Sequence, residues 1–387
     1  MSELEILLNG VEMVWRDLDE VATITIGEFV RKDSQDDSAE YPVYNGGISP
    51  TGYYDKFNNT GNKIIVSARG ANAGFVNRIT TPYWAGNSCY SIGVKDKSSV
   101  DWAFIYYYLK DNETRIIGDQ QKGGIPAISK KQMQLFEIPI PSIKIQKEIV
   151  RILNTFTELT TELTTELTAR KKQYSYYREQ LLTLDENEIE RKKLSDIVLK
   201  TSNIKWGGLN EEYRYIDLAS VCREKNIITE TTLINKENAP SRAKKIVLQN
   251  DVIFATTRPT QLRLCLINDE YSGEIASTGY CVLRANTKEV LPRWIYFWIT
   301  SNKFKNYVED NQSGAAYPAI SDSKVKDFLI PVPSKEEQER IVNILDKFDT
   351  LTTSISEGLP KEIELRKKQY EYYREKLLAF PKTVVEI

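Results

Sequence analysis

The sequence predicts a mixed α and β fold in which two globular modules are separated by a long antiparallel pair of helices. Three observations lead to this prediction: a repeated stretch of sequence, long segments with helical apolar spacing, and modules rich in short β-branched runs. The expected order is a first module over residues 1–142, a long helix over 143–184, a second module over 185–333, a second long helix over 334–380, and a tail over 381–387.

The repeat relates the two halves of the chain as pseudo-twofold copies. Residues 170–182 read RKKQYSYYREQLL and residues 366–378 read RKKQYEYYREKLL, so that 11 of 13 positions are identical. Upstream, IPIPS at 138–142 corresponds to IPVPS at 330–334. Two half-molecules joined in one chain indicate a function with two similar but non-identical targets.

Each module is expected to mix short strands with one aromatic helix. Runs such as KIIVS at 63–67 and DVIFA at 251–255 are β-branched or aromatic and are separated by Gly, Asn and Thr. The aromatic helices correspond to WAFIYYYL at 102–109 and WIYFWI at 294–299. Their side chains belong either to the core or to base-stacking platforms, and large aromatic side chains favour the core.

The long helices are predicted from apolar residues that recur every three or four positions. Both begin after a Pro-Ser pair, which suits a helix N-terminus, and each would be roughly 60 Å long at 1.5 Å per residue. Three Thr-Glu-Leu-Thr tetrads at 157–168 face four tetrads at 349–364, and Gly358 and Pro360 should kink or briefly break the second helix. The matched sequences favour an antiparallel pair over two unrelated surface helices.

Composition excludes several function classes. The chain has no histidine, which rules out histidine-dependent catalysis and His-ligated metal sites. Its four cysteines are widely spaced and are expected to be reduced and mostly buried, so no metal site is predicted. With 52 basic and 54 acidic residues, simple electrostatic adhesion to nucleic acid is disfavoured. No apolar run approaches the roughly 20 residues of a membrane span, and we expect a cytoplasmic protein.

The familiar catalytic signatures do not occur in the sequence. It contains no G-x-x-x-x-G-K-[ST] phosphate loop, no G-x-G-x-x-G, no Pro-Pro-aromatic signature of an amino-methyltransferase, and no Pro-Asp dipeptide that could open a metal-dependent nuclease motif. The chain is therefore predicted to recognise a partner rather than to catalyse a reaction.

Polar loops in both modules suit recognition of DNA. Arg pairs with guanine and Asn or Gln with adenine, while Gly, Ser and Thr allow close approach to phosphates. The candidate DNA-binding residues are Tyr44, Asn45, Gly46, Gly47, Ser67, Arg69, Asn72, Asn87 and Lys122 in the first module, and Thr256, Thr257, Arg258, Gln261, Arg263, Ser277, Thr278, Ser313 and Tyr317 in the second. Alternatively, the two arginines at 69 and 258 pair with carboxylates, and the glycines form ordinary turns.

The repeated helical stretch is either a solvated helix face or a surface for a repeated partner. Duplicated surfaces suit two copies of one protein, which favours the second interpretation. The candidate docking residues are Arg170, Lys171, Tyr174, Tyr177 and Arg178, with Arg366, Lys367, Tyr370, Tyr373 and Arg374 in the second copy.

These repeated helices, together with YPVYNGG at 41–47, WAGNSCYSI at 84–92 and FATTRP at 254–259, resemble the specificity subunit of type I restriction-modification systems. The resemblance covers essentially the whole chain. It implies that the modules are target recognition domains, each reading half of a bipartite asymmetric site in double-stranded DNA. It also implies that the helices dock two modification subunits, which use S-adenosylmethionine, and that restriction subunits add ATP- and Mg²⁺-dependent cleavage. No cofactor is then expected in this chain.

The sequence allows two alternative functions, a scaffold and a methyltransferase. A scaffold or adaptor would use the duplicated helices to bind two partners and its modules to recognise protein, and it would show no DNA sequence preference. A DNA methyltransferase acting alone is disfavoured by the missing motifs.

Overall fold

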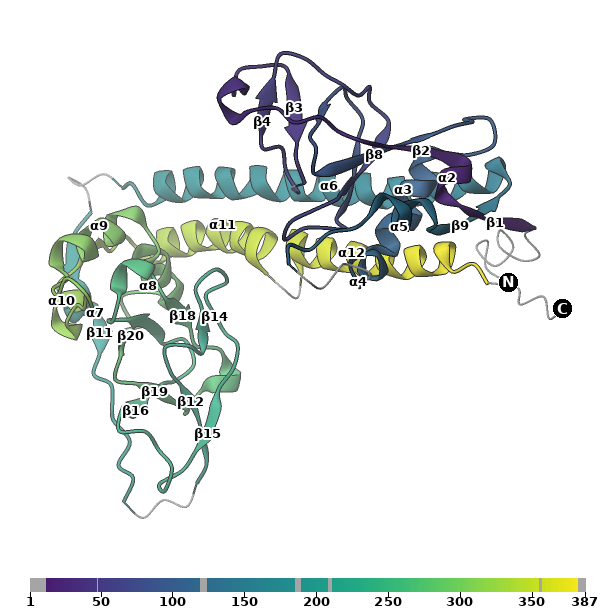
Figure 1. Ribbon diagram of the computed structural model, residues 1–387. Helices are drawn as coiled ribbons and strands as arrows, with labels where there is room; N and C mark the ends of the chain where they lie inside the picture. Colours follow the sequence, from purple (N-terminus) through teal and green to yellow (C-terminus); the bar gives the residue numbers. More distant parts are fainter. Residues whose placement is uncertain are drawn as a thin grey trace. The chain divides into compact units, whose positions relative to one another are not determined.

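The computed structural model describes residues 12–46, 48–118, 124–184, 189–207, 211–354 and 357–381. The chain divides into two compact units, each of mixed α and β structure (Figure 1). The first unit contains Met1–Glu162 and Glu364–Ile387, and the second contains Leu163–Ile363. Each unit therefore combines segments from both repeats. In the described ranges, no helix is long and apolar enough to cross a membrane.

Two sheets form the framework of the first unit. An antiparallel sheet has the strand order β2 (Ala22–Ile26), β8 (Cys89–Val94), β5 (Lys63–Ser67), β6 (Val76–Ile79). A smaller sheet has the order β4 (Gly52–Tyr54), β3 (Tyr41–Tyr44), β7 (Trp84–Ala85), with β3 and β7 parallel. A separate pair joins β1 (Met13–Asp17) to β9 (Glu137–Pro141).

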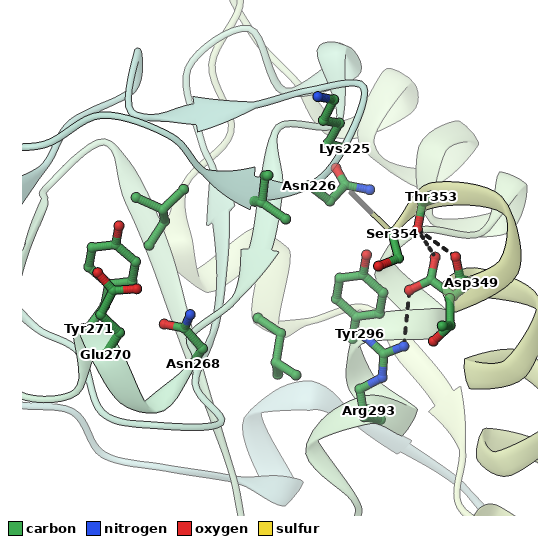
Figure 2. Close-up of a pocket in the computed structure, with 14 residues that line it drawn as sticks. Lys225, Asn226, Asn268, Glu270, Tyr271, Arg293, Tyr296, Asp349, Thr353 and Ser354 are labelled. Atoms are coloured by element: carbon green, nitrogen blue, oxygen red, sulfur yellow. Dashed lines mark hydrogen bonds and ion pairs between the residues drawn. The ribbon is translucent and has the colours of Figure 1, made fainter. Parts of the chain in front are cut away.

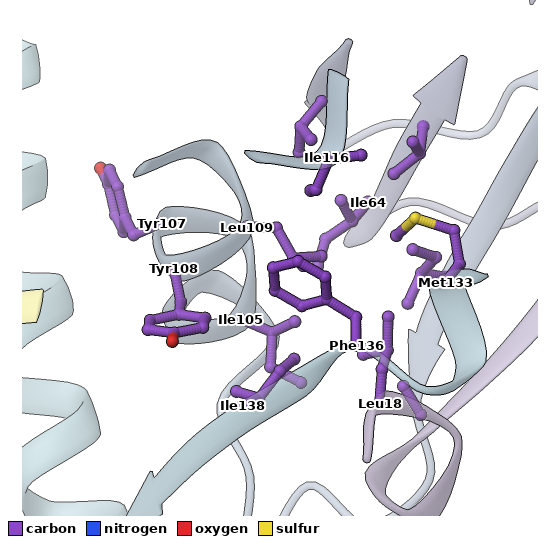
Figure 3. Packing of buried hydrophobic residues seen from close by; sticks show 14 of the residues in the cluster. Leu18, Ile64, Ile105, Tyr107, Tyr108, Leu109, Ile116, Met133, Phe136 and Ile138 are labelled. Atoms are coloured by element: carbon purple, nitrogen blue, oxygen red, sulfur yellow. The ribbon is translucent and has the colours of Figure 1, made fainter. Parts of the chain in front are cut away.

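The core of the first unit lies between its larger sheet and α3 (Trp102–Asp111). Asp101 caps α3 by accepting hydrogen bonds from the backbone of Ala103 and Phe104. Figure 3 shows Ile105 and Leu109 of α3 meeting Phe136 and neighbouring apolar side chains. The remaining short helices are α2 (Leu18–Val21), η1 (Lys32–Ser34), α4 (Glu113–Gly118) and α5 (Lys130–Gln134).

The second unit repeats this framework. Its antiparallel sheet has the order β11 (Val198–Leu199), β20 (Tyr280–Ala285), β17 (Val252–Ala255), β18 (Leu264–Leu266). Its second sheet has the order β15 (Thr232–Ile234), β12 (Tyr213–Ile216), β19 (Ile275–Ser277), β16 (Ala243–Ile246), with β12 and β19 parallel. Two further pairs join β10 (Arg191–Lys193) to β21 (Leu329–Pro331) and β13 (Val221–Cys222) to β14 (Ile227–Ile228).

The aromatic helix of the second unit, α8 (Pro292–Ile299), is a core element. Trp294 and Trp298 are at most 1% exposed, and the Trp294 indole donates to the Pro331 carbonyl. This confirms the core interpretation of the aromatic helices over the base-stacking one. The other short helices are α7 (Leu194–Ile197), η2 (Pro259–Gln261), η3 (Asp269–Tyr271), α9 (Asn302–Asn311) and α10 (Asp322–Lys326). All four cysteines are free, and only Cys222 is not fully buried.

The long helices agree closely with the predicted positions. The first, α6, spans Ile143–Leu181 and ends slightly before the expected residue 184. The reason is local: the Thr183 amide donates to the Gln180 carbonyl in a tighter turn, and Leu182 is buried in the core of the second unit. The predicted second helix is two helices, α11 (Lys335–Thr353) and α12 (Gly358–Leu378).

The interruption falls at the predicted glycine. Gly358 has φ +78°, and a Cβ atom there would lie 2.5 Å from the Thr350 carbonyl oxygen, so this position requires glycine. Pro360 lies in the first turn of α12, as expected. Four positions, 354–357, separate the two helices. The four residues added in the second copy lie between Phe348 and Arg366, and the break falls within the same segment.

Each unit contains an antiparallel helix pair made from both repeats. In the first unit, Phe156 of α6 stacks on Tyr373 of α12 with ring centroids 5.1 Å apart, while Leu377 and Leu378 enter the core. In the second unit, Tyr174 of α6 stacks on Phe348 of α11 at 6.1 Å. The end of each repeat therefore completes the core that the other repeat begins.

A buried glutamine fastens a long helix to each module. In the first unit, Gln146 donates to the carbonyls of Pro141 and Ser99 and accepts from the Asp101 amide. In the second, Gln338 donates to the carbonyls of Pro333 and Glu289 and accepts from the Leu291 amide. Both side chains are fully buried. The two clamps are equivalent, because both glutamines bind a proline carbonyl five residues upstream and a carbonyl and an amide just before the aromatic helix.

Candidate nucleic-acid interface

Three loops of the first unit are tied together at the end of β5. The Ala68 amide donates to the Ser88 carbonyl at 2.8 Å, which joins the segment after β5 to the turn before β8. The Ile128 amide donates to the Ala68 carbonyl at 2.9 Å, and the Gly70 amide donates to the Pro126 carbonyl at 3.0 Å. These backbone bonds bring the candidate residues of separate loops into one cluster, which we call the first loop cluster (residues 67–74, 86–88 and 124–128).

The second unit has a cluster built with the same bonds. The Thr256 amide donates to the Gly279 carbonyl at 2.8 Å, and the Ile320 amide donates to the Thr256 carbonyl at 2.9 Å. The Arg258 amide donates to the Pro318 carbonyl at 2.7 Å. We call residues 256–263, 277–279 and 312–320 the second loop cluster. By this pattern Gly70 corresponds to Arg258, and the residues before the two prolines, Ile125 and Tyr317, also correspond.

Exposed polar side chains cover both clusters. In the first, the exposed candidates are Arg69, Asn72 and Asn87. In the second, the exposed candidates are Arg258, Gln261, Thr278, Ser313 and Tyr317. Neither Arg69 nor Arg258 lies within ion-pair distance of a carboxylate in the described part of the chain, where the ion pairs involve other residues. This disfavours the alternative that the two arginines pair with acidic side chains. Their donors are available to a ligand.

Several other candidates support the loops from inside. The buried Thr256 hydroxyl donates to the Gly279 carbonyl, and the buried Ser277 hydroxyl accepts from the Gly279 amide. Arg263 donates to the backbone carbonyls of Leu218 and Val221. These side chains shape the second cluster from within.

In the first unit, the supporting bonds reach the loop that follows β3. The Asn45 side chain accepts from the Ser88 amide, and the Tyr44 carbonyl accepts from the Gly86 amide. Gly46 has φ +83° and Ser67 is buried. Thr257, half-buried, forms a bridge with Ala319 in the second unit. Two candidates, Gly47 and Lys122, lie outside the described residues.

Most predicted docking tyrosines pack inside their units. Tyr174 is half-buried, and burial raises the pKa of its hydroxyl. Tyr177 stacks on Phe348 at 6.0 Å but is 40% exposed. Burial likewise raises the pKa of Tyr370 to about 12. Their neighbours follow the same pattern: Arg178 lies over the Tyr174 ring, and Arg374 pairs with Asp111 at 2.8 Å. These residues hold the helix pairs together.

The outward helix faces carry a different pair of tyrosines. Tyr176 is 59% exposed and Tyr372 is 58% exposed, and they are equivalent positions of the repeated stretch. Lys171 and Lys367, both predicted for docking, are also exposed, whereas Arg170 and Arg366 are half-buried. Sequence reasoning missed the two tyrosines. The available signal was a large aromatic residue lying off the apolar stripe of a helix in both copies.

A pocket of about 440 Å³ lies in the second unit. Figure 2 shows Arg293 of α8 directed toward Asp349 of α11, with Thr353 above it. Asp346 also pairs with Arg293, so the guanidinium contacts two carboxylates. This ion-pair cluster ties α8 to α11.

No group of three or more described His, Cys, Asp or Glu residues is placed to hold a metal ion. The described site therefore consists of hydrogen-bond donors and acceptors on exposed loops. Such an arrangement can read base edges and contact phosphates.

Comparison with known proteins identifies the fold and the family. A family model described as the type I restriction modification DNA specificity domain matches residues 10–171 and again 186–365. The type I restriction enzyme EcoR124I/EcoR124II specificity subunit of Escherichia coli is 32% identical, over 99% of this chain and 98% of that protein. The EcoprrI specificity subunit of Escherichia coli is 28% identical, over 92% of each chain.

A solved structure shares the fold. The S subunit of a type I restriction-modification system from M. genitalium aligns with a TM-score of 0.66 at 21% identity, covering 97% of this chain and 98% of that one. The family model matches once in each repeat, and its two matches together cover most of the sequence. The chain therefore belongs to the type I restriction modification DNA specificity family.

Proposed function

We propose that this chain is the DNA sequence-specificity subunit of a type I restriction-modification complex, in which each module reads one half of a bipartite asymmetric site. One observation carries the proposal: two loop clusters have the same backbone bonds but different exposed side chains. Equivalent frameworks suit one kind of ligand, and different side chains suit different base pairs. The modules at 1–142 and 185–333 act as the two target recognition domains.

The chain contributes recognition, and the chemistry belongs to other subunits. Two modification subunits, which bind S-adenosylmethionine, dock on the duplicated helices, and restriction subunits add ATP- and Mg²⁺-dependent cleavage. The exposed faces that carry Tyr176 and Tyr372 support a repeated partner, because they present the same side chain in both copies. The formal net charge of −2 agrees with partners that supply part of the phosphate contacts.

The test is to map DNA methylation in a host that expresses this chain with the modification subunit of its own system. The expected result is one asymmetric motif with two defined halves and an undefined spacer. A matched strain that lacks only this chain should lose that motif. Methylation that persists without the chain, or a complex that binds duplexes without sequence preference, would favour an adaptor role instead.

A further inference from the structure

We infer that Arg258 and Tyr317 form one base-reading element of the second unit, which contacts a guanine in its half-site, and that the first unit lacks this element. The inference rests on the proposed function. It is carried by the backbone of Arg258, the position of its guanidinium, and the residues that occupy the equivalent positions of the first loop cluster.

The backbone of Arg258 is held in an unfavourable conformation. Its φ is +49° and its ψ is +54°, the left-handed region that residues other than Gly, Asn and Asp rarely adopt. The residue also precedes Pro259, and a residue before proline prefers an extended conformation. Strain of this kind persists where the surroundings enforce it, and it is concentrated at functional sites.

The surroundings that enforce this conformation lead directly to Tyr317. The Arg258 amide donates to the Pro318 carbonyl at 2.7 Å. Ser313 and Ala319 exchange two backbone hydrogen bonds of 2.8 Å, which close the loop that carries Tyr317. Gly314, with φ +94°, makes this loop possible. The backbone therefore fixes the arginine and the tyrosine relative to each other.

The side chains of this pair are positioned for a ligand. The Arg258 guanidinium carbon lies 5.6 Å from the centre of the Tyr317 ring, within the range of a cation–π contact. A cation–π contact does not use the guanidinium N–H groups as hydrogen-bond donors to another residue, and these donors are the part of arginine that pairs with O6 and N7 of guanine. Tyr317 itself is 74% exposed, and Arg258 makes no ion pair with a described carboxylate. The contact between the two side chains therefore forms without a ligand.

The first unit has the same framework without the pair. Gly70 replaces Arg258, with φ +91° and open space around the position of a Cβ atom. Ile125, 75% exposed, replaces Tyr317. The two equivalent positions thus carry an arginine and a tyrosine in one unit, and a glycine and an isoleucine in the other. This difference assigns the guanine contact of the arginine–tyrosine pair to the second half-site.

The experiment compares methylation maps of complexes that contain wild-type chain, Arg258→Lys, Arg258→Gly, Tyr317→Phe or Tyr317→Ala. Arg258→Lys keeps the charge but loses the planar fork, and Tyr317→Phe keeps the ring. We expect Arg258→Lys, Arg258→Gly and Tyr317→Ala to lower discrimination at one G·C pair of the second half-site roughly tenfold to a hundredfold. Tyr317→Phe and the matched control Ile125→Ala should leave the second half-site unchanged.

The same series of variants contains a control for loss of folding. Glycine adopts the left-handed conformation without strain, so Arg258→Gly should melt within a few degrees of wild type. Unchanged half-sites in Arg258→Gly would overturn the inference, and so would equal loss at both half-sites. A uniform fall in methylation with Arg258→Gly that Arg258→Lys restores would show a phosphate contact and overturn it as well. If the wild-type chain gives no bipartite motif, the proposed function itself fails.

Discussion

Replacing the buried Gln338 by leucine should loosen the second unit while leaving the first intact. The side chain makes three hydrogen bonds, to the carbonyls of Pro333 and Glu289 and from the Leu291 amide. Leucine removes all three and leaves buried backbone groups without their partner. At about 1–3 kcal/mol for an unsatisfied buried group, the expected loss of stability is roughly 3–5 kcal/mol, because some groups will recover water.

Hydrogen exchange of the full chain is the appropriate assay, because a chain with two units need not unfold in one step. The Leu291 amide and the first turn of α8 should exchange faster in Gln338→Leu, whereas the equivalent Asp101 amide of the first unit should keep its protection. Gln146→Leu should give the opposite pattern. The exposed Gln249 offers the matched control, since Gln249→Leu removes no buried bond. If the Leu291 amide of Gln338→Leu exchanged at the wild-type rate, Gln338 would not hold α11 to the second module in the way argued.

Two further predictions concern the helices. Gly358→Ala should destabilise the second unit by about 1–3 kcal/mol in a thermal melting experiment, because the left-handed backbone and the Thr350 carbonyl oxygen leave no room for a Cβ atom. The control is Gly207→Ala, which should not change the melting temperature because the space around Gly207 is open. Tyr176→Ala and Tyr372→Ala should each reduce the number of modification subunits that co-purify with the chain, with little change in melting temperature because both side chains are exposed. If a chain with both substitutions still bound as many modification subunits as the wild type, the docking surface would have to lie elsewhere.

The parts of the fold that depend on local periodicity could be predicted from the sequence. The start of α6, the aromatic core helices and the break before Gly358 all follow from patterns within a few turns of chain. The composition of each unit could not be predicted in this way. Leu377 completes the core of a unit whose sheet begins near residue 22, and such pairing depends on contacts far apart in sequence.

The candidate site shows the same limit. Residue types indicated which loops could meet DNA, but not which side chains face outward. Thr256 and Arg258 lie two positions apart, yet one hydroxyl is buried against a carbonyl and one guanidinium is exposed. Likewise, helical spacing places Tyr174 on the apolar stripe, whereas the exposed Tyr176 lies off it. Assigning roles required the backbone bonds that join distant loops.

The loop clusters are held by backbone bonds, which explains how two copies of one framework can carry different readers. Because these bonds do not depend on the exposed side chains, Asn72→Ala and Thr278→Ala should change the melting temperature little. Ser277→Ala removes the buried hydroxyl that accepts from the Gly279 amide, and it should lower the free energy of unfolding by about 1–3 kcal/mol. Thermal melting of the three variants checks this. Equal destabilisation by all three would mean that the exposed side chains also maintain the framework, and recognition could then not diverge without loss of stability.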